Sequence, residues 1–584
     1  MSFGLKTFLC LLWCIGAIGK DIELATYPPC AFNPLCTCSK GIPDLGIVQC
    51  KNVPFPAIPR MINTSKVFML HMENNELQRL EPYFFQATGL YGLSISSNPI
   101  TEIPDDAFTG LERSLWELHL TNNHLADVPS RAIRHLQKLR TLDLSMNQIS
   151  YVDHESWRGL EDSLEQLILA ENSIAHLPMD SFSGLPFLHT LDLSGNNLRE
   201  IDPNVFRDGM DKLTRVLLSN NLLTSIPYGQ VSTLRSLRVL DLSHNQISTM
   251  NLAENEYSAG IRLSLDALHL EYNTFEMLQT GSFQFFDVVN QTFLDGNPLQ
   301  FINDDAFRQA KIRELYIRHC HLDFISPGAF GGLENSLQIL DMSGNNLSSI
   351  PEILFQQLFS LKMRNIRSLA LSKLPKTDLG PEDFLDFGLE LENLRISGGN
   401  LKSIKSHTFK YVRGIRRLDL SDNAIATIDT DAFLEIGHAL QSLKLSHSFG
   451  SSFTSLPRDI LKPLTSLREL DMSNNKLKSI SDTSFHFLRN LHHLNVQDNQ
   501  IEQIVKGTFQ GDIHTNLETI LMGYNKIKYI PQHSFVDLEN VRSIILSDNQ
   551  IEKIERRAFM NLHQLRVLNL RGNKLTSISD EAFQ

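Results

Sequence analysis

A spacing of apolar residues that recurs along almost the whole chain constrains its fold more than any other feature. Aliphatic residues stand at the first, fourth, sixth and eleventh positions of a short motif, and asparagine stands at the ninth. Clear copies begin at Leu139, Leu188 and Leu565, and 21 copies occur from Val67 onward. The mean period is about 25 residues, so each copy is one structural unit that buries its apolar side by stacking on its neighbours.

This motif is the leucine-rich repeat, and its alternation predicts a short strand in every copy. Leu142 and Leu144 should point into the core while Asp143 between them faces outward. Stacked strands then form one parallel sheet, with irregular, 3-10 or short helical segments on the convex side. We therefore expect an α/β leucine-rich-repeat solenoid over residues 67–584.

The asparagine at the ninth position is expected to be buried where the chain turns away from the strand. Its amide can pair backbone groups that the turn leaves without partners, and losing such a partner costs about 1–3 kcal/mol. Asparagine fills this position in 17 of the 21 copies. Clear members of this asparagine ladder are Asn147, Asn196, Asn245, Asn345, Asn423, Asn499, Asn549 and Asn573.

Four copies depart from the asparagine rule. Cys320 can replace the amide because a buried thiol is a weak donor, and it needs no disulfide partner. Leu374, Gly399 and Ser448 fall in an irregular region over residues 351–462, where one step between copies is 29 residues long. We expect a kink, a bulging loop or a lost repeat in that region.

A phenylalanine recurs in the second half of the repeats and explains why the chain has 34 Phe but only 11 Tyr and 3 Trp. These rings should stack along the convex side of the core. The residues concerned are Phe108, Phe182, Phe206, Phe307, Phe330, Phe409, Phe433, Phe485, Phe509, Phe535, Phe559 and Phe583.

The N-terminus predicts secretion. Residues 1–19 contain Lys6, an apolar run that is too short to span a bilayer, and small residues before a cleavage site, as in a signal peptide. Residues 20–66 then form a cysteine-rich cap with Cys30, Cys36, Cys38 and Cys50. A bond between Cys36 and Cys38 is disfavoured by their spacing, so two connectivities remain open.

Composition and motifs argue against several classes of function. The net charge of −13 disfavours nucleic-acid binding, and no phosphate loop or hydrolase motif indicates an enzyme, a small-molecule substrate or a cofactor. His319 and His321 flank an inward Cys320, and His492 and His493 have no convergent partner, so we expect no metal site.

Outward positions of the strands suggest where a protein partner binds, because exposed aromatic clusters favour contacts between proteins. One candidate group is His269, Phe293 and Tyr316, with Tyr272 beside them, and a smaller group is Leu521, Tyr524 and Ile545. The alternative for Phe293 is that Thr292, in a core position, marks a shifted strand that turns Phe293 inward.

Three sequons predict glycosylation at Asn63, Asn290 and Asn346, and a glycan on Asn290 would crowd the aromatic group.

The chain stops at Gln584, with no C-terminal cap and no apolar tail. We expect a fragment of a longer protein.

Several stretches outside the generic repeat positions resemble the chaoptin family of insect photoreceptor adhesion proteins. They include Tyr27-Pro-Pro-Cys30, Cys36-Thr-Cys38-Ser-Lys40, and the segments at 44–56, 66–74, 102–111, 506–514 and 553–562. The resemblance implies a lipid-anchored, glycosylated cell-surface protein that joins rhabdomere microvilli by binding its own kind in trans. It also implies bonds from Cys30 to Cys38 and from Cys36 to Cys50. The irregular region looks shorter than the family pattern.

Two other classes use the same repeats. A Toll-like receptor ectodomain would capture a ligand, and a secreted matrix-organising protein would end after its cap. Only the specific resemblance favours adhesion.

Overall fold

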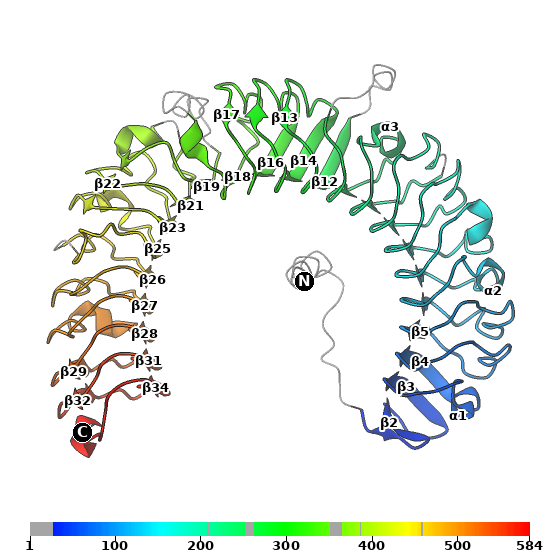
Figure 1. The fold of residues 1–584 in the computed structure, drawn as a ribbon, viewed down its shortest axis with the longest axis horizontal. Coiled ribbons are helices and arrows are strands. Elements are labelled where there is room, and N and C mark those ends of the chain that lie inside the picture. Colours follow the sequence, from blue (N-terminus) through cyan, green and yellow to red (C-terminus); the bar gives the residue numbers. More distant parts are fainter. Residues whose placement is uncertain are drawn as a thin grey trace. The chain divides into compact units, whose positions relative to one another are not determined.

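A computed structural model describes residues 27–206, 209–250, 262–350, 365–385, 387–456 and 459–583. The expected signal peptide, with Cys10 and Cys14, lies outside these residues. The chain divides into two compact units: unit 1 comprises residues 1–222 and 229–237, and unit 2 comprises residues 223–228 and 238–584. In each unit the strands line the inner side of the repeats and the connecting segments lie outside (Figure 1).

Unit 1 begins with the disulfide-bonded cap. Strand β2 pairs antiparallel with β3, with Cys36 opposite Cys50, and β3 then pairs in parallel with β4 of the first repeat. The disulfides join Cys30 to Cys38 and Cys36 to Cys50, which confirms the connectivity that the family resemblance implies. Closing the loop between Cys36 and Cys50 contributes about 3 kcal/mol in the chain-entropy model.

From β3 to β10, the strands of unit 1 form a parallel ladder in chain order. The helices are single turns. The elements are β1 Pro29–Cys30, β2 Asn33–Cys38, β3 Asp44–Lys51, α1 Arg60–Asn63, β4 Lys66–Glu73, β5 Gly92–Ser96, β6 Glu117–His119, α2 Ser130–Ile133, β7 Thr141–Asp143, η1 His154–Trp157, β8 Gln166–Ile168, β9 Thr190–Asp192 and β10 Arg215–Leu217; α3 Tyr228–Val231 follows.

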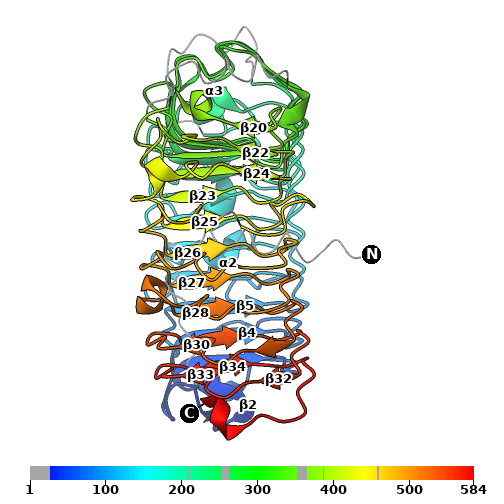
Figure 2. The same ribbon diagram turned by 90° about the vertical axis from the view of Figure 1, so that its left-hand side faces the viewer.

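Unit 2 continues the same design, and its strands run across the width of the solenoid (Figure 2). The ladder strands are β11 Val239–Asp241, β12 Leu263–His269, β14 Phe286–Phe293, β16 Lys311–Tyr316, β18 Ile339–Met342, β19 Ser368–Ser372, β21 Asn393–Ser397, β23 Arg417–Asp419, β25 Ser442–Lys444, β26 Glu469–Asp471, β27 His493–Asn495, β28 Thr519–Leu521, β31 Ser543–Ile545 and β34 Val567–Asn569.

Two-residue strands and 3-10 turns make up the remaining elements of unit 2. They are β13 Met277–Leu278, β15 Phe301–Ile302, β17 Phe324–Ile325, η3 Leu347–Ser349, β20 Asp378–Leu379, η4 Pro381–Phe384, β22 Ser403–Ile404, β24 Thr427–Ile428, η5 Leu434–Ile436, η6 Asp512–Thr515, β29 Tyr529–Ile530, β30 Phe535–Val536, β32 Lys553–Ile554, β33 Phe559–Met560 and η7 Asp580–Phe583. The fold is thus a leucine-rich-repeat β-solenoid with few short helices.

The asparagine ladder connects neighbouring repeats. Nδ2 of Asn196 donates to the carbonyl oxygens of Leu169 and Leu193 at 2.9 and 3.0 Å, and its Oδ1 accepts the Ile174 N–H at 3.0 Å. Seven further members likewise donate to a carbonyl of their own repeat and accept an N–H of the preceding one: Asn147, Asn245, Asn345, Asn423, Asn499, Asn549 and Asn573.

Most of the convex rings stack on the ring of a neighbouring repeat, whereas Phe108 is buried without a described ring stack. Trp157 takes the phenylalanine position of its own repeat and stacks on Phe182 at 6.3 Å. Phe583 stacks on Phe559 at 5.6 Å but is 48% exposed rather than buried.

The irregular region keeps a continuous strand ladder. Leu340 of β18 pairs with Leu369 of β19, which pairs with Leu394 of β21, so the described strands stay paired across the long step. Residues 351–364, within that step, lie outside the described residues. Ser448 replaces the missing amide, because its Oγ donates to the Leu420 carbonyl at 2.8 Å.

Candidate protein-contact surface

Three aromatic side chains form a stacked platform on the strand face of unit 2. His269 of β12 lies beside Phe293 of β14, which lies beside Tyr316 of β16, because the three strands pair in register. The ring centroids are 4.6 Å apart for His269 and Phe293 and 4.8 Å apart for Phe293 and Tyr316, with interplanar angles below 10°. We call these three residues the aromatic platform.

The alternative in which Phe293 turns inward is wrong. Thr292 is fully buried and pairs with the core residues Leu268 and Leu315, so threonine occupies the core position without shifting the strand. Phe293 is consequently half-buried on the outer side of the sheet. The threonine hydroxyl has no hydrogen-bond partner, which is a local cost of this arrangement.

Charged side chains hold the Tyr316 end of the platform in place. The Tyr316 hydroxyl donates to Glu314 Oε2 at 3.0 Å, and the same oxygen accepts a bond from Gln291 Nε2 at 2.8 Å. Arg318 lies 5.1 Å from the Tyr316 ring centroid and donates to Asp295 through two nitrogens. Burial and the Glu314 hydrogen bond raise the pKa of Tyr316, so this ring is uncharged at neutral pH.

A second aromatic row lies just past the ends of the strands. The Tyr272 ring stacks on His244 with a centroid distance of 4.5 Å and is 55% exposed. On its other side lies Gly296, where an added Cβ would lie 2.5 Å from the ring. Sequence reasoning identified Tyr272 but missed His244. His244 directly precedes the ladder residue Asn245, just as Tyr272 directly precedes Asn273, so the sequence contained this signal.

The second predicted group is only partly brought together. Leu521 of β28 and Ile545 of β31 are register partners and half-buried on the strand face. Tyr524 follows the end of β28 in a left-handed conformation and is 55% exposed. These residues form no described ring stack, so the platform is the better-defined surface.

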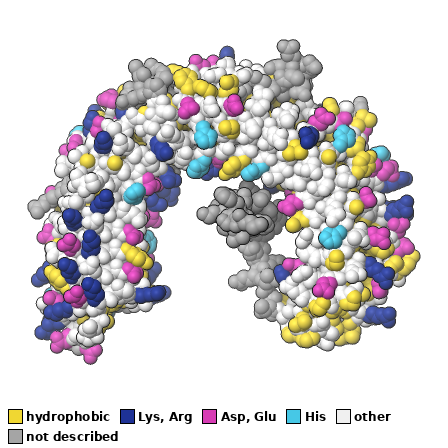
Figure 3. Space-filling view, viewed as in Figure 1, with side chains coloured by type: hydrophobic (Ala, Val, Ile, Leu, Met, Phe, Trp, Pro, Cys, Tyr) yellow, Lys and Arg dark blue, Asp and Glu magenta, His cyan; other side chains and the backbone are white. Residues whose placement is uncertain are grey.

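Sequence reasoning missed an aromatic group in unit 1. Phe68, Tyr91 and Trp116 stack in succession, with centroids 5.0 and 5.3 Å apart. The Arg140 guanidinium lies 4.0 Å from the Trp116 ring centroid. Each follows the first aliphatic residue of its repeat, a recurrence that was readable in the sequence. Figure 3 shows hydrophobic side chains gathered at the cap end of unit 1. Phe68, in the first repeat after the cap, is 52% exposed.

The sequon asparagines lie in three different settings. Asn63 ends α1 and is half-buried, whereas Asn290 lies within β14, beyond its middle, and donates to Asp266 at 3.0 Å. Asn346 is exposed, and the hydroxyl of Ser348 in the same sequon donates to its Oδ1 at 2.7 Å. Glycosylation of these residues stays a prediction.

The sequence candidates for metal chemistry do not converge. The His319 ring lies over Gly344, whereas Cys320 is buried and directs its thiol to the Leu294 carbonyl at 3.4 Å. Burial raises the pKa of Cys320 to about 12, so the thiol stays protonated. Among the described residues, no group of three or more His, Cys, Asp or Glu side chains is placed to hold an ion. No helix in the described parts is long and apolar enough to span a membrane.

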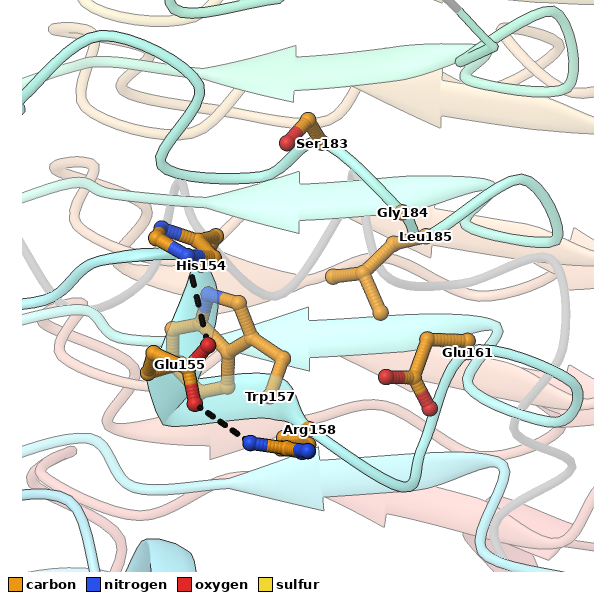
Figure 4. Close-up of a pocket in the computed structure, with 8 residues that line it drawn as sticks. All are labelled: His154, Glu155, Trp157, Arg158, Glu161, Ser183, Gly184 and Leu185. Carbon is orange, nitrogen blue, oxygen red and sulfur yellow. Dashed lines mark hydrogen bonds and ion pairs between the residues drawn. The ribbon is translucent and has the colours of Figure 1, made fainter.

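A pocket of about 250 Å³ lies on the outer side of unit 1 (Figure 4). Glu155 pairs with both His154 and Arg158, at 3.3 and 3.2 Å, and buried Trp157 donates to the Ser181 carbonyl. The principal polar groups of this pocket thus form hydrogen bonds or ion pairs within the protein. The aromatic surfaces are therefore the better candidates for partner binding.

Comparison with known families agrees with the repeat assignment. The chain matches the family described as leucine rich repeat at residues 65–125, 113–163, 162–209, 211–254 and 310–372. It matches the BspA type leucine rich repeat region at residues 377–516 and 454–584.

Individual relatives are more specific. Chaoptin of Drosophila melanogaster is 57% identical over 547 residues, which cover 85% of this chain. The chain is a homologue of chaoptin. Chaoptin of Tribolium castaneum is 51% identical over 133 residues, or 23% of this chain and 17% of the relative. The chaoptin homologue spans 41% of the length of the Drosophila protein.

A solved structure shares the fold of this chaoptin homologue. A chain of the Drosophila Toll–Spatzle complex superimposes with a TM-score of 0.61 at 20% identity. The match covers 89% of the homologue and 66% of that chain. At this identity, the likeness shows a common leucine-rich-repeat architecture alone.

Proposed function

We propose that this protein is an extracellular adhesion glycoprotein of photoreceptor cells. It binds a second copy of itself on an apposed membrane and so joins the microvilli of the rhabdomere. Secretion places the repeats outside the cell, and a lipid anchor supplied by the full-length protein holds them at the plasma membrane. The 57% identity to Drosophila chaoptin across 85% of the chain carries this proposal.

The surface chemistry supports binding between proteins. A solenoid offers a long surface for recognition, and aromatic anchors supply much of the binding energy at protein interfaces. The aromatic platform places three rings side by side on such a surface. We propose that the platform, together with Tyr272, is a protein-contact surface of the adhesion reaction.

Capture of a separate protein ligand is the second candidate function. The observation that favours it is the position of the platform on the inner strand face, which suits a protruding partner. The two functions differ in what the isolated chain does when only copies of itself are present.

Bead clustering distinguishes these functions. Beads coated with the secreted chain, residues 20–584, are expected to cluster with one another and to exclude beads that carry an unrelated leucine-rich-repeat protein. Circular dichroism and a cooperative thermal transition establish that the coated chain is folded. If beads coated with folded chains produce no clusters, the proposal of self-adhesion by this part of the protein is wrong, and capture of a separate protein ligand becomes the favoured hypothesis.

A further inference from the structure

Unit 1 carries a row of side chains that its own fold does not require. Phe68, Tyr91, Trp116, Arg140 and Glu165 occupy the same position in five successive repeats, and we call them the flank strip. The backbone N–H of each later member donates to the carbonyl of the one before, at 2.8 Å in all four cases. Neighbouring strands are about 4.8 Å apart, so the strip is about 19 Å long.

The strip lies where the strands begin, on one flank of the repeats rather than on their inner face. Phe68 is 52% exposed, Tyr91 and Trp116 are half-buried, and Arg140 and Glu165 form an ion pair of 3.1 Å. A flank can meet the same flank of another copy, whereas a concave face needs a protruding partner. An isologous contact between two copies therefore suits the strip better than it suits the platform.

The order of side chains along the strip suits contact with its own reverse. Phe68 lies at one end, the rings of Tyr91 and Trp116 follow, and Arg140 with Glu165 ends the row. When two strips meet antiparallel about an axis between Tyr91 and Trp116, these two rings oppose each other. Phe68 then faces the other copy's Arg140, so a cation–π contact forms at each end of the two-fold contact.

We propose that the flank strip of unit 1 is a two-fold self-contact surface that binds the strip of a second copy. The inference rests on the proposed function, because it names the surface through which copies meet. A row about 19 Å long buries far less than the roughly 800 Å² per partner of a standard stable interface. Each contact is consequently weak, and adhesion follows from many contacts between two membranes.

The corresponding row in unit 2 has a different chemistry. Its residues are charged or polar throughout the described strands, and one of them is the sequon residue Asn290. They are Arg238, Asp266, Asn290, Arg313, Gln338, Arg367, Glu392, Arg416, Gln441, Arg468, His492, Glu518, Arg542 and Arg566. The repeats of unit 2 fold with polar residues in this position, so folding does not require aromatic residues there. The three aromatic rings of unit 1 therefore need a reason other than folding.

Truncation of the central rings tests the aromatic part of this contact. The double variant Tyr91→Ala and Trp116→Ala should raise the Kd for self-association at least about ten-fold, since truncated aromatic anchors commonly have this effect. Sedimentation of the secreted chain at high concentration measures the Kd, and bead clustering measures adhesion. Tyr151→Ala is the matched control, because Tyr151 is a 54% exposed tyrosine of unit 1 outside the strip.

Replacement of Arg140 tests the two-fold geometry. Arg140→Glu should reduce clustering by about ten-fold, because symmetry places the changed residue opposite Phe68 in two contacts. Mixed clusters of Arg140→Glu beads and wild-type beads should be intermediate in extent, because each mixed contact keeps one of its two arginines. Unchanged clustering by the variant would contradict the two-fold contact, and thermal melting identifies a variant that fails to fold.

The outcomes separate this inference from the proposed function. If wild-type beads cluster while the ring variant clusters and sediments equally, the strip is wrong and self-adhesion stands. If wild-type beads fail to cluster while sedimentation shows a weak dimer that the ring variant loses, the strip stands and adhesion by this chain is wrong. If neither assay detects self-association, both are overturned.

Discussion

Tyr272 owes its exposed position to a glycine in the next repeat. Gly296 has a φ of +68°, a conformation that costs any L side chain, and its missing Cβ leaves room for the Tyr272 ring. The Gly296→Ala change should therefore lower the free energy of unfolding by about 1–3 kcal/mol and displace Tyr272 from His244. Denaturant unfolding and near-ultraviolet circular dichroism measure these two effects.

Gly281→Ala is the control for backbone strain. Gly281 has a similar φ of +74°, but the nearest atom to an added Cβ is the flexible Gln284 side chain at 3.7 Å. The loss at Gly296 should exceed the loss at Gly281, and equal losses would mean that contact with the Tyr272 ring contributes nothing.

The asparagine ladder makes a second prediction for single residues. Asn196→Ala removes the partners of the Leu169 and Leu193 carbonyls and of the Ile174 N–H, so it should destabilise unit 1 by about 2 kcal/mol or more. Asn196→Ser should cost less, because Ser448 shows that a hydroxyl in this position can donate to the preceding repeat. Hydrogen exchange of the adjoining repeats measures both changes, and a serine variant as unstable as the alanine variant would contradict this account.

At the level of the strands, the sequence predicts most of the fold and part of the candidate surface. Period-two alternation and the ladder asparagine place Phe293 and Tyr316 on the outer side, because every repeat obeys the same packing rule. The pattern alone could not predict whether Phe293 keeps this outward position or turns inward. A threonine in the core position before it, Thr292, is compatible both with a shifted strand and with a buried hydroxyl that has no hydrogen-bond partner. The aromatic residues of the flank strip were also readable in the sequence, but the repeat pattern assigns no role to the position after the first aliphatic residue, because that position is charged or polar in the repeats of unit 2.

The aromatic platform gives a prediction for these strands. Phe293→Ala together with Tyr316→Ala removes two ring stacks of about 0.5–1.5 kcal/mol each but leaves the buried Leu268 and Leu315 in place. The repeats should remain folded, with a melting temperature only a few degrees lower, while bead clustering falls. Tyr529→Ala changes a 41% exposed tyrosine of unit 2 off the strand face and serves as the control. Unchanged clustering would remove the platform from the adhesive surface.

At the scale of the whole molecule, net charge opposes the proposed self-contact. Two copies that each carry −13 repel one another at long range, whatever their local contacts. The apolar and aromatic parts of the contact act only at short range, and exposed ion pairs contribute little. Copies should therefore approach one another more readily when the repulsion is screened.

Salt dependence follows from this balance. Raising the ionic strength from about 0.01 to 0.15 M shortens the Debye length from about 30 to 8 Å, and bead clustering should become faster and more extensive. The Arg140→Glu variant, whose net charge is more negative by two than that of the wild type, should show a steeper rise of clustering with salt, because it adds repulsion that salt removes. A wild-type chain that clusters less as salt increases would mean that ion pairs, rather than aromatic contacts, dominate the self-contact.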